Sequence, residues 1–235
     1  MKAFILAGGL GTRLRSITKD LIPKPMVKIN NKPVLEHTLE LLTKYGIKDI
    51  ILSIGHLGEQ IIEYFGNGSK WGANIMYIKE DYKTGTAGAL RLAKPFLNSD
   101  EGFIMINGDN LYNINIDKMK KIFFNNYRLA TIALTRAKDV TKYGVADVTI
   151  YGVRIKKFVE KPTAKEAPSD LVNAGFYMFQ PEVLAYVPNK KYSMIETEVF
   201  PQLLRDEEFY GYVMEKEWYP VGTPEEYKIA SEEWK

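Results

Sequence analysis

Residues 2–14 read KAFILAGGLGTRL, an apolar segment that runs directly into three glycines placed within four positions. These glycines are Gly8, Gly9 and Gly11. Glycine lets backbone N–H groups turn inward onto an anion, and Arg13 and then Lys24 follow with positive charge for phosphate. The stretch therefore predicts a buried strand that ends in a loop for a nucleoside triphosphate.

Two common phosphate motifs do not fit this loop. No Gly-Lys-Ser/Thr closes it, so it is not a Walker loop. Leu14 stands where the third glycine of the dinucleotide fingerprint G-x-G-x-x-G belongs. A glycine turn that only happens to precede a basic segment is the alternative to a phosphate loop.

Residues 8–26, GGLGTRLRSITKDLIPKPM, resemble the signature GGxGTRLxPLTxxxPKPM of the nucleotidyltransferases that activate sugar 1-phosphates. The chain carries one more residue before Pro-Lys-Pro and differs between Leu14 and Thr18. The resemblance implies an α/β fold, a Rossmann-like three-layer sandwich of GT-A-like type with a mostly parallel mixed sheet. The nucleotide-binding residues that it implies here are Leu6, Ala7, Gly8, Gly9, Gly11, Thr12 and Arg13.

Apolar runs that alternate with amphipathic segments predict the same fold class. In the first half we expect strands over 2–6, 49–54, 74–78, 103–106 and 129–134, and helices over 33–45, 58–65, 87–93 and 116–125. In the second half we expect strands over 144–150, 154–158, 171–179 and 210–214, and helices over 181–186, 195–204 and 224–233. The alternation predicts a mostly parallel sheet with ligands at the carboxyl ends of its strands.

Length and composition fit one compact domain. The chain has 235 residues, 46% of them hydrophobic, and no linker or repeat divides it. We expect a single domain over 1–235, with a nucleotide-binding half (1–135), a sugar-phosphate-binding half (136–235) and no C-terminal β-helix. A net charge of +3 with interspersed Lys and Arg gives no case for nucleic-acid binding.

The remaining composition narrows the chemistry further. There is no cysteine, which excludes disulfides and thiolate metal sites, and the two histidines lie on different elements. No apolar run reaches the roughly 20 residues that cross a bilayer, and the chain begins with a strand rather than a signal peptide. We therefore expect a soluble, cytoplasmic protein that does not bind membranes.

The segment Asn107-Gly108-Asp109 follows the apolar run 103–106. Glycine permits a sharp exit from the strand, and a carboxylate is a hard oxygen ligand suited to Mg²⁺. In the family that the chain resembles, this place holds the catalytic metal, so Asp109 takes that role by resemblance. An Asx turn after a strand is the alternative.

Residues 82–89, YKTGTAGA, match the family's G-T-A-G-A segment, and the resemblance places Gly85, Thr86 and Ala87 at the base. Glu80 falls at the family's base-reading position. An ionised carboxylate only accepts hydrogen bonds, and guanine offers two adjacent donors, whereas thymine and uracil offer one. Glu80 therefore favours GTP over dTTP or UTP, although an exposed loop acid is an open reading of the same residue.

Three later segments have counterparts in the family in the same order: 143–145, 158–162 and 173–177. By resemblance Glu160 receives sugar hydroxyls and Lys161 neutralises the sugar's phosphate. The other implied sugar-phosphate residues are Asn107, Gly108, Gly144, Asn173 and Glu196. Helix capping accounts for Glu196 about as well.

One departure from the family affects the metal. The family's W-x-D-x-G-T-P reads Trp218-Tyr219-Pro220-Val221-Gly222-Thr223-Pro224 here, so Pro220 stands at the place of the second metal-binding Asp. Proline has no side-chain oxygen. Either Asp109, nucleotide phosphates and water complete the Mg²⁺ shell, or metal binding is weakened.

The resulting hypothesis is an Mg²⁺-dependent transfer of a nucleotidyl group from a nucleoside triphosphate to a sugar 1-phosphate, resembling mannose- or heptose-1-phosphate guanylyltransferases. Its catalytic residues are Arg13, Lys24, Asp109 and Lys161. A thymidylyl- or uridylyltransferase and a non-catalytic NDP-sugar-binding regulatory homologue are the alternatives. A glycosyltransferase is disfavoured because the chain has no D-x-D pair. The sequence does not identify the sugar, and it leaves undetermined both the base and whether the protein forms a homo-oligomer.

Overall fold

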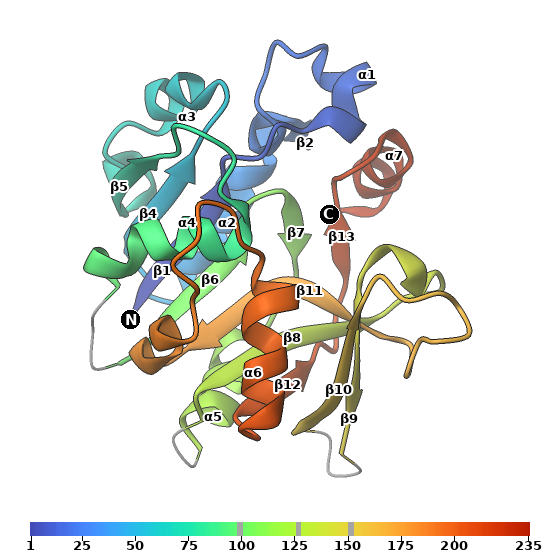
Figure 1. The fold of residues 1–235 in the computed structure, drawn as a ribbon. Coiled ribbons are helices and arrows are strands. Elements are labelled where there is room, and N and C mark those ends of the chain that lie inside the picture. The colour runs from blue at the N-terminus through green and yellow to red at the C-terminus, as the bar shows by residue number, and fades with distance from the viewer. Residues whose placement is uncertain (98–100, 126–127, 150–152) are drawn as a thin grey trace. The chain divides into compact units, whose positions relative to one another are not determined.

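The computed structural model describes residues 1–97, 101–125, 128–149 and 153–235. Figure 1 shows the helices and strands coloured along the sequence. The chain forms two compact units that interleave along the sequence. The first unit comprises Met1–Lys83, Ile106–Asn113 and Glu217–Lys235, and the second comprises Thr84–Met105 and Ile114–Lys216. The strand expected over 144–150 includes residue 150, which lies outside the described residues.

Three strands of the first unit pair in parallel. They are β1 (Lys2–Ala7), β4 (Asp49–Ile54) and β5 (Asn74–Lys79), with β4 paired to both of the others. The register sets Ala7 beside Ile54 and Ile54 beside Lys79, so the carboxyl ends of the strands lie together. The loop after β1 and the residue after β5, Glu80, therefore begin at one edge, as expected for ligand-binding segments of parallel sheets.

Amphipathic helices accompany these strands. The helices of the first unit are α1 (Arg15–Thr18), α2 (Val34–Lys44), α3 (Gly58–Phe65) and α7 (Pro224–Glu233), with short 3₁₀ turns η1 (Thr12–Leu14), η2 (Lys24–Met26) and η3 (Ser69–Trp71). In α2 the buried residues Leu35, Leu39 and Leu42 recur at helical spacing and form one apolar face. The sequence predicted α3 and α7 with these bounds.

Two very short strands tie the C-terminal segment to the middle of the chain. β7 (Asn110–Tyr112) pairs antiparallel with β13 (Trp218–Pro220), and Pro220 lies opposite Asn110. A small hairpin joins β2 (Lys28–Ile29) to β3 (Lys32–Pro33). None of these four strands was expected from the sequence, because two or three residues give no readable periodicity.

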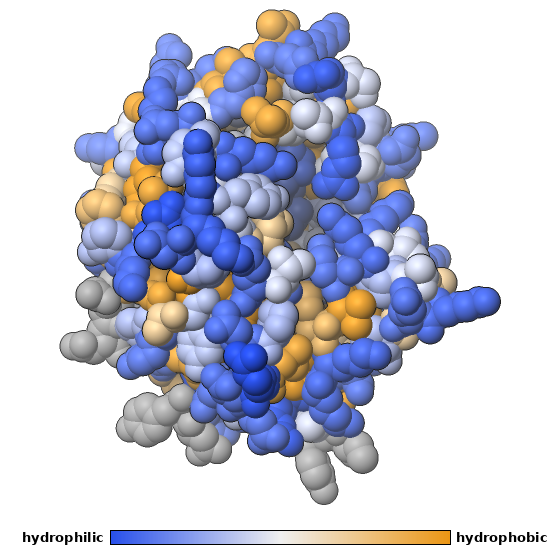
Figure 2. All heavy atoms as spheres, viewed as in Figure 1, coloured by the Kyte–Doolittle hydropathy of each residue, from blue (hydrophilic) through white to orange (hydrophobic). Residues whose placement is uncertain are grey.

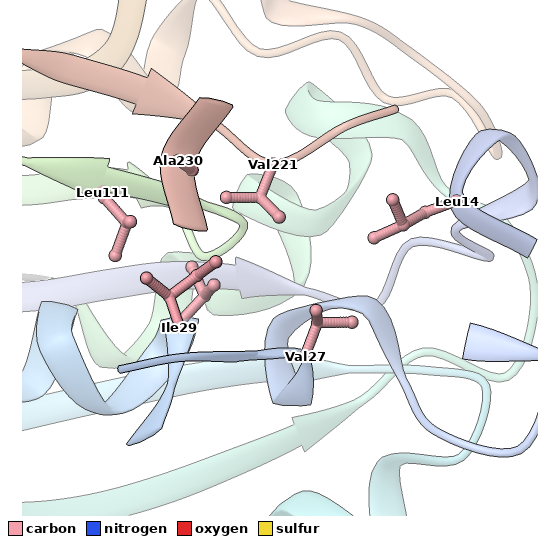
Figure 3. Packing of buried hydrophobic residues seen from close by; sticks show 7 residues of the cluster. Leu14, Val27, Ile29, Leu111, Val221 and Ala230 are labelled. Atoms are coloured by element: carbon pink, nitrogen blue, oxygen red, sulfur yellow. The ribbon is translucent and has the colours of Figure 1, made fainter. Parts of the chain in front are cut away.

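A buried apolar cluster fixes the segments that surround the glycine loop. Figure 3 shows its side chains converging from the turn after the loop, from the β2 region, from β7 and from the C-terminal segment. The cluster consists of Leu14, Val27, Ile29, Val34, Leu111, Val221 and Ala230. Leu14 is 0% exposed, so the chain that carries Arg13 is anchored directly beside that residue. Burial of this kind stabilises by about 1.5 to 3 kcal/mol for each large aliphatic side chain.

The second unit is built mainly from antiparallel pairs. Its strands are β6 (Phe103–Asn107, whose last two residues belong to the first unit), β8 (Ala130–Arg136), β9 (Gly144–Val148), β10 (Ile155–Glu160), β11 (Leu171–Phe179) and β12 (Phe209–Val213). β11 pairs antiparallel with β8, β10 pairs antiparallel with β9, and β12 pairs parallel with β8. Aromatic contacts among Tyr177, Phe179, Phe200 and Phe209 fill its core.

The helices of the second unit differ in part from expectation. They are α4 (Gly85–Ala93), η4 (Lys94–Phe96), α5 (Ile116–Phe124), η5 (Val140–Lys142), η6 (Pro181–Ala185), η7 (Ile195–Val199) and α6 (Phe200–Arg205). The helix expected over 181–186 is a 3₁₀ turn, and the helix expected over 195–204 is a π-helical turn followed by α6. Pro201 has no N–H to donate back to the preceding turn, which interrupts a regular α-helix there.

The surface carries scattered apolar side chains. Figure 2 shows a mostly hydrophilic face with apolar spheres at the top of the view, where Figure 1 places the chain around α1. The exposed apolar residues of that stretch are Leu10, Ile17, Leu21 and Ile22. Across the described ranges, no helix combines the length and the apolar character needed to cross a membrane.

Candidate active site

The glycine loop leaves β1 at Ala7 and packs tightly against the end of β5. A Cβ atom added to Gly8 would lie 2.4 Å from Glu80 Oε1, and one added to Gly55 would lie 2.6 Å from Gly8 O. A side chain at either position would therefore collide with its neighbours. A Cβ atom added to Gly9 would meet no atom of the described residues within 4 Å, so there is open space beside this part of the loop.

Gly11 holds the loop against Lys24. Its φ of +63° lies in the left-handed region that favours glycine, and an added Cβ would lie 3.1 Å from Lys24 Cβ. Lys24 begins the short turn η2 after the extended residue Pro23. The glycine loop and the basic segment that contains Lys24, which were predicted to serve the same phosphate site, are thus in direct contact.

Lys24 forms an ion pair with Asp109 through Nζ and Oδ2. Only 11% of the Lys24 side chain and 30% of the Asp109 side chain are exposed. Asp109 follows the end of β6, where Gly108 N donates to Leu6 O at 2.9 Å and so ties this turn to β1. An added Cβ at Gly108 would lie 2.9 Å from that same oxygen, which explains the glycine of the Asn-Gly-Asp segment.

Arg13 and Lys24 also meet the C-terminal segment. The Cβ position of Gly222 lies 3.4 Å from Arg13 Nη2 and 3.5 Å from Lys24 Nζ. Glu226, on the first turn of α7, accepts a hydrogen bond from Gly222 N at 2.8 Å. Two cations and two carboxylates, those of Asp109 and Glu226, therefore lie around the loop. The sequence did not single out Gly222 or Glu226, although the capping pattern Thr223-x-x-Glu226 was readable.

The first unit contains the one metal-binding side chain that was predicted from the sequence, Asp109. Asp109 offers a partly exposed carboxylate, and Pro220, opposite Asn110 in the β7–β13 pair, offers no oxygen from its side chain. Among the described residues no group of three or more His, Cys, Asp or Glu is arranged to hold a metal ion. This donor set fits Mg²⁺ in the manner in which one carboxylate, substrate phosphates and water surround the ion.

Glu80 is fixed by two contacts to β4. Its N–H donates to Ile54 O at 2.8 Å, and its Oε1 accepts a hydrogen bond from Ser53 Oγ at 2.7 Å. Ser53 is 0% exposed. The residue predicted to read the base therefore has a defined carboxylate orientation. Its buried partner, Ser53, was not predicted from the sequence.

The second unit brings together a group of acidic and basic side chains. Lys161 Nζ lies 3.8 Å from Glu160 Oε1, and Lys161 adopts a positive φ of 47° while its N–H donates to Tyr143 O at 3.0 Å. An added Cβ at Gly144 would lie 2.3 Å from Phe158 Cζ and 2.8 Å from Glu160 Oε2. Gly144 is thus required by the position of Glu160.

Glu196 belongs to the same group of side chains. Thr86 donates to Glu196 Oε2 at 2.9 Å, and Thr86 Oγ1 in turn accepts from Ile195 N at 2.8 Å. Burial raises the pKa of Glu196 above its ordinary value of 4.5. Burial and then the negative charge of Glu196 raise the pKa of Glu160 as well.

Two predicted residues are engaged within the protein. Asn173 Nδ2 donates to Tyr177 OH at 2.9 Å, and Asn173 Oδ1 accepts from Gly175 N at 2.9 Å. Asn107 O accepts from Tyr112 OH at 3.1 Å. The roles proposed for Asn173 and Asn107 toward a sugar stay predictions, as do those of Thr12 and Ala87.

Gly85 is required by its surroundings. It has a φ of +76°, and an added Cβ would lie 2.3 Å from Ser193 O. Ser193 O also accepts hydrogen bonds from Ala87 N and Gly88 N at 3.1 and 3.2 Å, so this carbonyl holds the first turn of α4. The small residues of the 82–89 segment therefore allow a close backbone approach.

Comparison with known proteins shows the family. A sequence model described as "Nucleotidyl transferase" matches residues 2–235, and the chain belongs to this family. A mannose-1-phosphate guanyltransferase of Yarrowia lipolytica is 37% identical over 97% of this chain and 62% of its own length. A UTP–glucose-1-phosphate uridylyltransferase of Synechocystis is 36% identical over 97% of this chain and 61% of its own length.

A solved structure is similar over its whole length. HddC from Yersinia pseudotuberculosis, complexed with GMP-PN, has a TM-score of 0.81 and 28% identity, with 100% of this chain and 99% of that chain covered. The similarity confirms the expected mixed α/β fold with a mostly parallel sheet. The chain spans only about three fifths of the length of the curated relatives that it matches.

Proposed function

We propose that the protein transfers a nucleotidyl group from a nucleoside triphosphate, GTP in preference, to a sugar 1-phosphate, with release of pyrophosphate. The observation that carries the proposal is the cluster formed by the open glycine loop, Arg13, Lys24 and Asp109 in the first unit. Family membership and the names of the relatives support the reaction class.

The reaction is an in-line displacement at phosphorus. An anionic oxygen of the sugar 1-phosphate bonds to the α-phosphorus, and the bond from the α-phosphorus to the bridging oxygen of the β-phosphate breaks. The electron pair leaves with pyrophosphate, and no proton transfer is required. The difficulty is repulsion between anions and charge on the leaving group, so positioning and cationic screening dominate.

The residues of the first unit would supply this screening. Backbone N–H groups of the open Gly9 region and the guanidinium of Arg13 would hold the departing phosphates. Lys24, nearly buried and already beside a carboxylate, would stabilise the α-phosphoryl group. Asp109 would hold Mg²⁺, which when bound supplies charge neutralisation to the phosphates.

The residues of the second unit would bind the sugar 1-phosphate. Glu160 and Glu196 offer fixed acceptors for sugar hydroxyls, and Lys161 offers a point charge for phosphate. The Lys161 side chain is 65% exposed, so it is accessible to a ligand. Burial is the largest cause of the raised pKa of Glu160 and of Glu196, and a hydrogen bond from a sugar hydroxyl is stronger in such a low-dielectric site than in water.

The base and the sugar are the finer part of the proposal. Glu80 favours guanine because an ionised carboxylate accepts from both N1–H and N2–H₂. The guanyltransferase relative and the GMP-PN complex of the solved neighbour agree with this preference, whereas the uridylyltransferase relative supports the alternative base. The described residues do not select one sugar, so the sugar is identified by assay.

The test combines each of five triphosphates, GTP, dTTP, UTP, ATP and CTP, with each member of a panel of sugar 1-phosphates. Pyrophosphate release and product formation are measured for every pair. We expect release that needs both substrates and Mg²⁺, with GTP the best nucleotide. Release without sugar 1-phosphate, or none with any pair, would contradict nucleotidyl transfer.

One observation favours a second candidate. Pro220 lies in β13 opposite Asn110, next to Asp109, and brings no carboxylate there. A chain with a weakened metal site would suit an NDP-sugar-binding regulatory homologue without turnover. Binding of an NDP-sugar without pyrophosphate release from any pair would decide for this candidate.

A further inference from the structure

Ser53 has no part in the proposed reaction, but its side chain contacts Glu80. Ser53 is the fifth residue of β4, and its side chain is 0% exposed. Its hydroxyl donates to Glu80 Oε1 at 2.7 Å. A buried hydroxyl that donates its single proton to a carboxylate stabilises one orientation of that carboxylate.

The backbone around Glu80 restricts the same side chain from another direction. Glu80 N–H donates to Ile54 O, which continues the register of β5 along β4 by one residue. Gly8 of the glycine loop approaches so closely that a Cβ there would overlap Glu80 Oε1. The carboxylate therefore lies between a buried hydroxyl and the loop that we assign to phosphate.

We propose that Ser53 is a specificity-determining positioning residue, which holds the Glu80 carboxylate in the orientation that reads the N1–H and N2–H₂ edge of guanine. This inference rests on the proposed function, and it assigns a part of the base selection to a buried residue that touches no ligand. Pre-organisation of the acceptor lowers the entropy that binding must otherwise lose.

Loss of the Ser53 hydroxyl should affect recognition of the base and leave recognition of the phosphates unchanged. Without the Ser53 hydroxyl, Glu80 Oε1 loses its anchor and the carboxylate rotates more freely. Recognition of two adjacent donors suffers from this rotation, whereas recognition of phosphate by the glycine loop does not depend on the angle of the carboxylate. The variant should therefore lose discrimination between bases rather than affinity for triphosphates in general.

The probe pair is GTP and ITP, because hypoxanthine lacks the 2-amino group but is otherwise the same base. Binding of each nucleotide is measured by calorimetry in the absence of any sugar 1-phosphate. For the wild-type protein we expect GTP to bind more tightly than ITP. For Ser53→Ala we expect this ratio to fall by roughly 10-fold, the size of one hydrogen bond to a charged group.

Three further variants separate positioning from stability. Ser53→Thr and Ser53→Val have nearly the same volume and differ in the hydroxyl, so Thr should keep the ratio and Val should lose it. Thr38→Val is the control for removal of a buried hydroxyl in the same unit, since Thr38 is 2% exposed and its Oγ1 has no hydrogen-bond partner among the described residues. The control should leave the ratio unchanged.

The outcomes are distinct from those of the proposed function. An unchanged GTP-to-ITP ratio in folded Ser53→Ala, or equal ratios in the Thr and Val variants, would overturn the role of Ser53. Equal binding of GTP and ITP by the wild-type protein would also overturn it. Nucleotide binding without pyrophosphate release would instead reject the transfer reaction and leave the role of Ser53 standing.

Discussion

Lys24 and Asp109, 85 residues apart in the sequence, form an ion pair beside the glycine loop. The Lys24 side chain is 11% exposed, so its charge is held at one place rather than free in solvent. The carboxylate that is suited to a metal and the cation that is suited to phosphate thus neutralise each other before any ligand arrives.

Lys24→Ala is expected to leave a folded protein with at least about 100-fold less pyrophosphate release, the cost of removing one preorganised charge contact in a transition state. Lys28→Ala, at the exposed first residue of β2 and four residues after Lys24, is the control and should retain turnover. Rates are measured with saturating substrates and Mg²⁺. Turnover of Lys24→Ala equal to that of the wild type would remove Lys24 from the chemistry.

Gly11→Ala tests the contact between the loop and Lys24. Both Gly11 and Gly46 have positive φ, so alanine at either position costs about 1 kcal/mol of stability. Only at Gly11 does the added Cβ lie close to Lys24, at 3.1 Å from its Cβ, whereas nothing lies within 4 Å at Gly46. We expect similar losses of stability in urea unfolding but a loss of pyrophosphate release in Gly11→Ala alone. Equal activity of the two variants would contradict the account.

Pro220→Asp tests whether a second carboxylate strengthens the metal site. Pro220 lies opposite Asn110 in the β7–β13 pair, and Asn110 directly follows Asp109 in the sequence. A carboxylate at position 220 is therefore expected to lower the Mg²⁺ concentration that gives half-maximal activity. Pro220→Ala separates the added carboxylate from the loss of the proline ring and should not shift the Mg²⁺ dependence. Identical Mg²⁺ titrations for Asp and Ala would show that the position does not reach the metal.

Glu196→Gln tests the buried acidic group of the second unit. Burial raises the pKa of Glu196, so the folded protein holds a proton at a pH where the unfolded chain has lost it. The free energy of unfolding therefore falls as pH rises from 4.5 through the folded-state pKa. Glutamine does not titrate, and the variant should show a smaller fall in that window.

Urea unfolding at several pH values from 4.5 upward measures this slope. Glu232→Gln, an exposed residue of α7, is the control and should keep the wild-type slope. A slope for Glu196→Gln as steep as that of the wild type would show that Glu196 titrates normally in the folded state.

Many of the helices and strands could be predicted from the sequence, because long segments show a clear hydrophobic periodicity. The expected bounds of β4, α3, β11 and α7 agree with the structure. The β7–β13 pair was missed because each strand has three residues and one contains Pro220. Its pairing depends on burial of Leu111 and Val221 in a shared cluster, which no local pattern reveals.

The candidate site was readable where a motif named the residue. The sequence predicted the loop, Lys24 and Asp109, and the structure brings them together within one unit. It did not reveal Ser53, which reads as one more residue of a buried strand, or Glu226, which reads as a helix cap. Partners of this kind are defined by tertiary contacts between segments far apart in the sequence, so no local pattern predicts them.

The most direct test of the central claim is a crystal structure of the protein with GTP and Mg²⁺. We predict the triphosphate on the backbone of residues 8–11, with Arg13 and Lys24 on its phosphates and Asp109 at the metal. A triphosphate bound elsewhere, with the glycine loop empty and the Lys24–Asp109 pair intact, would contradict the account.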